Sequence, residues 1–256
     1  MNTVTIVLLL LAVIVISIAI VVFSQMRERA RIEKARRLAG LEDSYNLAYR
    51  IYDELPGQYL TRDLKLILLR RMETLCQQLL QEGTRLPVSE WLTTVNENKQ
   101  KVIDGTDKHP QVVIDSPEQS SHVKELLQSL FKLIESLHKS GNIDSAAARE
   151  NLHQVLFTIR KTHADLFVFQ ARDHVRKGEL RKAIHAYNMA ASEMNKIHGH
   201  EMAARAVASF NERIRELEEE MASGHNALTE DQQRRLDKEW DTFLHGDDWK
   251  KKADYD

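Results

Sequence analysis

Histidine is the side chain whose number in this sequence could indicate chemistry. The chain has eleven histidines, and seven of them lie between His138 and His200. A metal site needs converging ligands, commonly two histidines four residues apart on a helix or a histidine with a nearby carboxylate. His198 and His200 form the one close pair, but they flank a glycine and lack a clear third ligand. We therefore interpret this pair as part of a surface turn and predict no metal site.

Other reactive side chains lack the neighbours that catalysis requires. His174 and His185 are expected to face each other across a helical hairpin, either as hydrogen-bonded core residues or as a pH-sensitive contact. The adjacent carboxylates Glu42 and Asp43 point to different helix faces, so they do not converge as an acid and a base. The chain contains no phosphate-binding glycine loop, nucleophile elbow, kinase signature or H-E-x-x-H motif. We predict neither an enzyme nor a cofactor, although a site built from distant residues would leave no such local pattern.

The first stretch of the chain is its most apolar part. Residues 4–23 read VTIVLLLLAVIVISIAIVVF, in which Thr5 and Ser17 are the polar members. A helix of this length spans about 30 Å, which matches the hydrocarbon core of a bilayer. A cleaved signal peptide would need a basic start, a shorter apolar run and a small-x-small cleavage site, and the sequence lacks these. Residues 4–23 are therefore predicted to form a retained transmembrane helix, and residues 1–3 before it are expected to lie outside the cytoplasm.

Basic residues follow this apolar stretch at once, and none precedes it. Such an excess of Lys and Arg marks the cytoplasmic side, so the N-terminus is expected outside and the body inside. We expect a single-pass protein of a bacterial inner (plasma) membrane, in which the same cluster can contact anionic head groups. The basic cluster comprises Arg27, Arg29, Arg31, Lys34, Arg36 and Arg37.

The composition favours an all-α body behind the predicted anchor. The chain has only four prolines and nine glycines, whereas 43% of its residues are hydrophobic and 29% are charged. The single cysteine, Cys76, cannot form an internal disulfide, and its place in an apolar stripe favours a buried inert thiol. The formal net charge of −2 leaves no broad basic surface, so we expect no nucleic-acid partner.

Breaks in the apolar periodicity divide the body into segments. Periodicity stops at the stretch DGTDKHPQVVIDSPEQSS, which holds two of the four prolines and is typical of a linker. The predicted segments are a basic juxtamembrane helix (24–40), an N-terminal helical unit (41–103), a linker (104–121), a helical-hairpin domain (122–222), a C-terminal helix (223–245) and a disordered tail (246–256).

One part of the hairpin domain resembles a known repeat. The stretch FVFQARDHVRKGELRKAIHAYNMAASE is similar to one tetratricopeptide repeat, a pair of antiparallel helices, over about residues 164–197. A weaker similarity to the repeat surrounds Gly141. At the end of the matching stretch, Asn195 stands where a proline often closes the repeat. The resemblance assigns structural roles to Phe167, Ala171, Gly178, Ala183, Tyr187 and Ala190. It implies a partner-binding surface, for which the candidates are Gln170, His174 and Arg181.

Three functions remain open at this point. The first is a membrane-anchored cytoplasmic adaptor or scaffold that binds a protein partner through the repeat-like surface. The second is a self-associating subunit of a cell-envelope complex, because the helix at 200–222 carries a heptad-like apolar stripe that could form a coiled coil with a second copy. The third is a membrane-attached enzyme whose site leaves no local motif.

Overall fold

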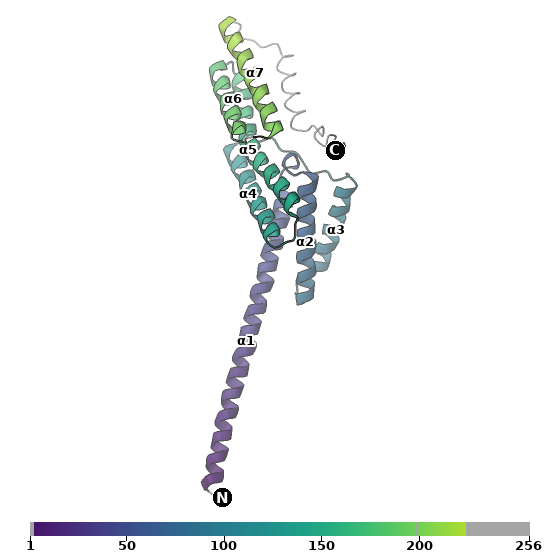
Figure 1. Ribbon diagram of the computed structural model, residues 1–256, viewed down its shortest axis with the longest axis vertical. Coiled ribbons are helices and arrows are strands. Elements are labelled where there is room, and N and C mark those ends of the chain that lie inside the picture. Colours follow the sequence, from purple (N-terminus) through teal and green to yellow (C-terminus); the bar gives the residue numbers. More distant parts are fainter. Residues whose placement is uncertain (1–2, 198, 224–256) are drawn as a thin grey trace. The chain divides into compact units, whose positions relative to one another are not determined.

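The computed structural model is built from α-helices (Figure 1). It describes the backbone of residues 3–197 and 199–223, and the side chains of residues 22–197 and 199–223. This part of the chain contains no β-strand, so the prediction of an all-helical fold is confirmed for it. The helices described are α1 (Thr3–Glu54), the short 3-10 helix η1 (Gly57–Tyr59), α2 (Arg62–Glu82), α3 (Val88–Ile103), α4 (Pro117–Lys139), α5 (Ser145–Arg176), α6 (Leu180–Asn195) and α7 (Glu201–Ser223).

Helix α1 continues through Gly40, where we expected the juxtamembrane helix to end. A glycine inside a helix costs about 1 kcal/mol relative to alanine. The helix-forming residues on both sides offset this cost, and no atom crowds the position. The helix ends at Glu54 because Leu55 precedes Pro56, and the residue before a proline disfavours the helical conformation.

Several predictions fall on residues that the structure does not describe. The side chains of residues 1–21, which make up most of the expected membrane span at 4–23, lie outside the described set. No helix in the described part of the chain has the length and the apolar character needed to cross a membrane. The expected C-terminal helix at 223–245, apart from Ser223, and the tail at 246–256 also lie outside the described residues.

The chain divides into two units that are not continuous in sequence. Residues 1–49 and 68–100 form the first unit, and residues 50–67 and the chain from 101 onward form the second. The division differs from the predicted one because α1, α2 and α3 each contribute residues to both units.

In the first unit, α1, α2 and α3 all supply buried apolar side chains. The ring of Tyr45 stacks on that of Trp91, with 4.6 Å between the ring centroids. Cys76 is fully buried, and this burial raises the pKa of its thiol to about 11. The other buried apolar residues of this unit include Ala48, Leu68, Leu69, Met72, Leu75, Leu79, Val88 and Val95.

The predicted linker, residues 104–121, is tied into the second unit. Residues 104–116 have no helix, but their backbone and side chains contact the segment at 52–65. Lys65 Nζ lies 2.5 Å from Asp107 Oδ2, and the backbone N–H of Gly57 donates to the carbonyl of Pro110 at 2.7 Å. The remainder of the predicted linker is the first turn of α4.

Helices α4 to α7 pack in chain order, each against the one before it (Figure 1). The hydroxyl of Ser116 caps α4 by accepting from the backbone N–H of Gln119 at 3.3 Å. The carboxylate of Asp144 caps α5 by accepting from the backbone N–H groups of Ala146 and Ala147. Helix α5 is one continuous helix of 32 residues, and its C-terminal half is the first helix of the repeat-like unit.

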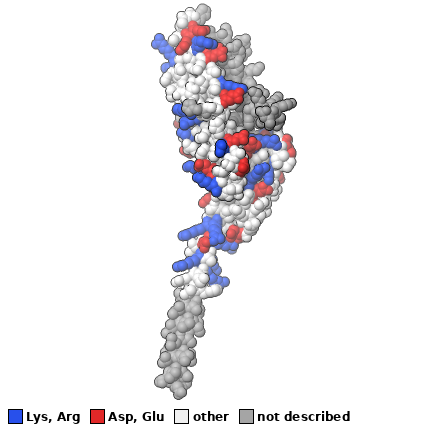
Figure 2. All heavy atoms as spheres, in the orientation of Figure 1, with Lys and Arg blue, Asp and Glu red and all other residues white. Residues whose placement is uncertain are grey.

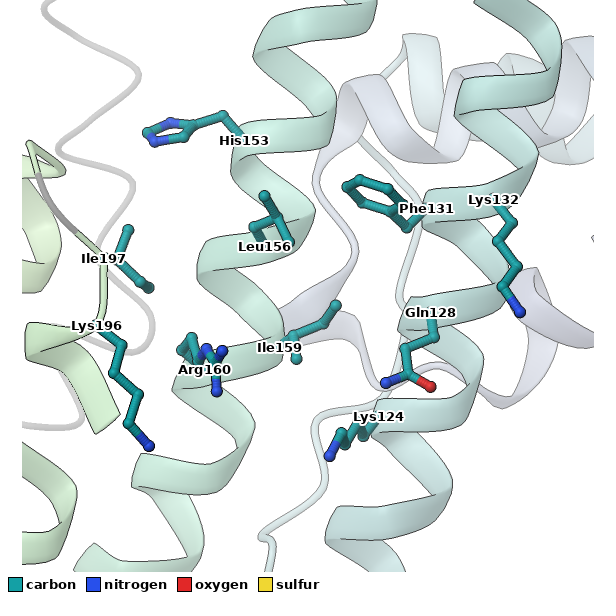
Figure 3. Close-up of a pocket in the computed structure, with 10 residues that line it drawn as sticks. All are labelled: Lys124, Gln128, Phe131, Lys132, His153, Leu156, Ile159, Arg160, Lys196 and Ile197. Carbon is teal, nitrogen blue, oxygen red and sulfur yellow. The ribbon is translucent and has the colours of Figure 1, made fainter. Parts of the chain in front are cut away.

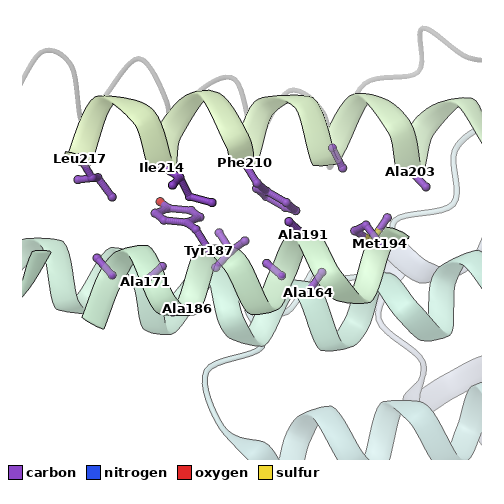
Figure 4. Close-up of a cluster of buried hydrophobic side chains, with 14 of the residues drawn as sticks. Ala164, Ala171, Ala186, Tyr187, Ala191, Met194, Ala203, Phe210, Ile214 and Leu217 are labelled. Atoms are coloured by element: carbon purple, nitrogen blue, oxygen red, sulfur yellow. The ribbon is translucent and has the colours of Figure 1, made fainter. Parts of the chain in front are cut away.

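A core rich in alanine joins α5, α6 and α7. Figure 4 shows Phe210, Ile214 and Leu217 of α7 pointing toward Tyr187 of α6. The rings of Tyr187 and Phe210 lie 6.2 Å apart. The small side chains allow the three helix backbones to approach closely. The alanines of this core that are no more than 1% exposed are Ala164, Ala171, Ala183, Ala190, Ala203 and Ala206.

The turns after α4 and α5 have the same construction. Gly141 and Gly178 both adopt positive φ, at 72° and 70°. The backbone N–H of Asn142 donates to the carbonyl of Leu137 at 2.9 Å, and the N–H of Glu179 donates in the same way to His174. These bonds close both helices with the same C-terminal cap. The correspondence between Gly141 and Gly178 seen in the sequence therefore extends to the turn geometry.

Candidate functional site

A groove of about 780 Å³ lies on the second unit, over the N-terminal half of α5. Figure 3 shows α5 along its middle, with side chains of α4 on one side and the end of α6 on the other. We refer to it as the α5 groove. Its lining residues are Lys124, Gln128, Phe131, Lys132, His153, Leu156, Ile159, Arg160, Lys196 and Ile197.

Helical spacing brings these side chains together. Lys124, Gln128 and Lys132 follow one another at intervals of four residues and share one face of α4, and Phe131, next to Lys132, borders that face. His153, Leu156 and Arg160 share a face of α5 for the same reason. The groove residues of α4 and those of α5 each span about two helical turns, or roughly 12 Å along the helix axis.

The middle of the groove is apolar. Leu156 is 46% exposed although it lies on the helix that packs between α4 and α6. In Figure 3 the side chain of Phe131 projects from α4 toward α5, and that of Leu156 lies over α5 in this view. The remaining apolar lining comes from Ile159 and Ile197. Exposed apolar side chains in a concave surface are typical of a binding site.

Four cationic side chains surround this apolar middle: Lys124, Lys132, Arg160 and Lys196. Among the described residues, neither Lys124 nor Lys132 makes an ion pair. No carboxylate is among the described residues that line the groove. It therefore has a positive rim that can attract an anionic ligand.

Glu193 lies beneath part of this rim and compensates some of its charge. Its carboxylate is 3.4 Å from Arg160 Nη1 and also pairs with Lys196. Burial opposes its ionisation, but the bond to Lys196 and the surrounding positive charges outweigh burial and lower its pKa. His163 Nδ1 lies 3.8 Å from the same carboxylate, yet burial and the nearby cations lower the pKa of His163.

Aromatic rings lie at the His153 end of the groove. His200 stacks on Phe157 with 4.1 Å between the centroids, and His153 lies 5.2 Å from His200. Burial, followed by the neighbouring His153, lowers the pKa of His200. Nδ1 of His200 is buried and has no hydrogen-bond partner among the described residues. The arrangement favours the neutral form of His200.

A buried polar cluster lies further along α5. The hydroxyl of Tyr59 donates to Asp165 Oδ2 at 2.6 Å, and Lys161 Nζ donates to the same oxygen at 3.0 Å. The Lys161 ammonium also lies 4.9 Å from the centroid of the Tyr59 ring. Burial and the Asp165 carboxylate raise the pKa of Tyr59 far above its usual range. With Tyr59 only 1% exposed, the cluster anchors η1 to α5 and offers no open site.

The repeat-like residues lie in the core of α5, α6 and α7 or at its turn. Phe167 packs partly buried against this core, Tyr187 is 6% exposed, and Gly178 adopts the positive φ of the turn. Ala171, Ala183 and Ala190 are fully buried. Apart from Gly178 at the turn and the partly buried Phe167, the side chains of these residues therefore pack in the core and are not available at the surface.

The candidate partner-binding residues lie away from the groove. Gln170, His174 and Arg181 are not among its lining residues. His174 Nδ1 is 2.7 Å from a carboxylate oxygen of Glu179, close to the turn at Gly178. The structure therefore does not bring these three predicted residues together with the concave surface that it contains.

All six residues of the basic cluster on α1 are exposed. Figure 2 shows basic side chains along this part of α1. Arg37 pairs with Glu33 one turn earlier, which raises the pKa of Arg37. No group of three or more His, Cys, Asp or Glu side chains suited to a metal ion occurs within the described residues.

Sequence reasoning missed the groove because its lining resembles an ordinary solvated face. On α4, Lys124, Gln128 and Lys132 occupy the polar side of an amphipathic helix. The one available signal is Phe131 next to Lys132, an aromatic residue outside the main apolar stripe. On α5, Leu156 adds an apolar side chain beside the buried Val155 and Phe157, which widens the apolar face beyond one stripe.

Comparisons of this chain with protein-family models, with curated proteins and with solved structures found no match.

Proposed function

We propose that this protein is a membrane-anchored adaptor whose helical body binds a protein partner in the α5 groove. The observation that carries the proposal is the combination of an exposed apolar middle with Lys124 and Lys132 at its edge, which make no ion pair with any described residue. Apolar contacts supply affinity, and a charged rim supplies specificity and faster association.

The anchor in this proposal is residues 4–23, with the basic cluster on the cytoplasmic side. An apolar stretch of this length followed by Lys and Arg supports a single span with the body in the cytoplasm of a bacterium. Anchoring would confine a bound partner to the membrane surface and raise its effective concentration there.

The repeat-like character of the body is part of the same proposal. Two helix pairs with the same glycine turn, at Gly141 and Gly178, support a short tetratricopeptide-like arrangement. When helices pack one after another in this way, two neighbours flank each middle helix and form a concave face over it. Repeat proteins bind their partners on such concave faces.

The test is co-purification of the full-length protein from its native membrane in mild detergent, followed by mass spectrometry. The variant Leu156→Glu places a charge in the middle of the groove. Its matched control, Met189→Glu, places the same charge at an apolar residue of α6 that is 38% exposed and does not line the groove. A partner retained by the wild type and by Met189→Glu but lost from Leu156→Glu is the expected result.

Two outcomes would contradict the proposal. One is recovery of the protein alone, and the other is a partner that binds the Leu156→Glu variant as well as the wild type. The anchor is tested separately by deleting residues 4–23, which should release the protein from carbonate-washed membranes. Retention of the deleted form would contradict the membrane assignment.

Self-association through α7 has less support than the adaptor function. The apolar stripe that could form a coiled coil includes Ala206, Phe210 and Leu217, and all three are buried within the chain's own core. Pairing with a second copy through this stripe would have to displace α6. No feature of the described residues favours the alternative of a membrane-attached enzyme.

A further inference from the structure

We infer that the α5 groove binds an acidic amphipathic helix whose carboxylates lie two turns apart on either side of an apolar anchor. The inference rests on the proposed function and specifies the chemistry of the partner. The proposed occupant is a protein segment, and binding of a lipid instead is a competing outcome of the test.

The sign of the partner's charge follows from the rim. Arg160 and Lys196 share the carboxylate of Glu193, whereas Lys124 and Lys132 have no ion-pair partner among the described residues. An acidic side chain that approaches these two lysines gains a charge-assisted hydrogen bond without displacing an existing pair. A basic segment would meet four cationic side chains and be repelled.

The spacing of the acidic residues follows from the geometry of α4. Lys124 and Lys132 are eight residues apart, which places their Cα atoms about 12 Å apart along the helix axis. On a bound helix, residues separated by seven or eight positions have the same separation and the same face. Two carboxylates at that spacing can each meet one lysine.

The apolar part of the ligand follows from the middle of the groove. Residues three or four positions after the first acid lie on the same face of a helix, halfway between the two carboxylates. Apolar residues at these positions of the bound helix would therefore meet Leu156, Phe131 and Ile159, the apolar side chains in the middle of the groove. A helix lying in a groove with such anchors is a recurring mode of peptide recognition.

A lipid head group fits these observations less well. A phosphatidylglycerol head group presents one anionic centre, and Lys124 and Lys132 would have to bend toward each other along α4 to share it. The positive charges are instead distributed along the groove and on both of its sides. This distribution matches a ligand with several separate negative charges.

The probe is a fluorescent, alanine-based helical peptide of about five turns, with two glutamates two turns apart and leucines between them. Binding to the full-length protein in nonionic detergent is measured by fluorescence anisotropy. A peptide with glutamines in place of the glutamates is the neutral control. We expect the acidic peptide to bind at least tenfold more tightly than the neutral one, and to weaken as salt is added.

Charge reversal tests which residues provide this affinity. The double variant Lys124→Glu with Lys132→Glu should reduce binding of the acidic peptide at least tenfold. The matched control reverses Lys139 and Arg149, which are exposed on α4 and α5 and do not line the groove, and it should bind like the wild type. A peptide with lysines in place of its glutamates should bind the groove double variant more tightly than it binds the wild type.

Three results would overturn the inference. The first is equal binding of the acidic and neutral peptides, and the second is unchanged binding by the groove double variant. The third is a signal that depends on Lys124 and Lys132 with micelles containing phosphatidylglycerol but not with the peptide, because it would identify a lipid site.

Failure of the inference can be told apart from failure of the proposed function. If co-purification of a partner is lost in Leu156→Glu but retained in the groove double variant, the adaptor function stands and the acidic partner is excluded. If Leu156→Glu also retains the partner, the proposed function itself fails.

Discussion

The two halves of α5 use the same kind of helical face in different ways. In the C-terminal half, Ala164 and Ala171 are fully buried against α6 and the core that it shares with α7. In the N-terminal half, Leu156 and Arg160 remain accessible, and the neighbouring helices border a groove. Small side chains let helices close over them, whereas long side chains hold their neighbours apart. One helix therefore supplies both part of a closed core and the candidate binding surface.

The difference separates stability from binding along one helix. A closed alanine interface has no room for a larger or charged side chain, so substitutions there should act on folding. The groove is already open to solvent, so substitutions there should act on ligands. The predictions below test this separation, beginning with the largest expected effect.

The contrast should be greatest between a glutamate in the closed core and one in the groove. Ala183 is 0% exposed, so Ala183→Glu buries an unpaired charge and should cost roughly 3 kcal/mol or more. Leu156→Glu should change the free energy of unfolding by only about 0.5 kcal/mol. Urea unfolding followed by circular dichroism measures both. Similar losses for the two variants would contradict the separation.

The junction of the two halves depends on the bond between Tyr59 and Asp165. Tyr59→Phe removes the hydroxyl that donates to Asp165 at 2.6 Å. The loss should reduce the free energy of unfolding by roughly 2 kcal/mol, because a buried carboxylate loses a hydrogen bond. Tyr49→Phe is the control, since Tyr49 is 45% exposed and should tolerate the change. A Tyr59→Phe protein as stable as the wild type in thermal unfolding would rule out this role.

The two glycine turns should respond alike, although one precedes the groove half of α5 and the other follows its closed half. Gly141→Ala and Gly178→Ala each force alanine into positive φ and should cost about 1 kcal/mol. No neighbouring atom within 4 Å adds to the cost at either turn. Gly40→Ala, inside α1, should have the opposite sign, because alanine favours a helix. Unequal costs at the two turns would show that they are not equivalent.

The smallest expected effect is the pH response at His200, which packs on Phe157 at one end of the groove. Burial and His153 lower the pKa of His200 below its ordinary 6.5, while Glu201 acts in the opposite direction. The unfolded chain therefore takes up a proton before the folded one does, and this contribution to stability is lost as the pH falls below about 6.5. The wild type should lose more thermal stability between neutral and mildly acidic pH than His200→Phe does. Parallel pH profiles would contradict this prediction.

Local pattern was enough to predict the helices and much of the closed core. The resemblance to a tetratricopeptide repeat assigned structural roles to Ala171, Gly178, Ala183 and Tyr187, which all lie within a single helical hairpin. Helix ends were harder to place, because α1 continues through Gly40 and α4 begins inside the predicted linker. Packing can override a local break of this kind.

The candidate site could not be predicted in the same way. Its residues come from α4, α5 and the end of α6, and each stripe by itself looks like a solvated helix face. The cluster of Tyr59 and Asp165 joins residues 106 positions apart, which no local pattern can indicate.

The sequence by itself determined that the described chain is helical, because helical periodicity is a property of neighbouring residues. Only the tertiary structure decided that Lys124, Lys132 and Leu156 border one concave surface, and that residues 50–67 belong with the chain after residue 101. These outcomes depend on how closely helices approach one another. That distance is set jointly by side chains from several helices, so no single segment of the sequence specifies it.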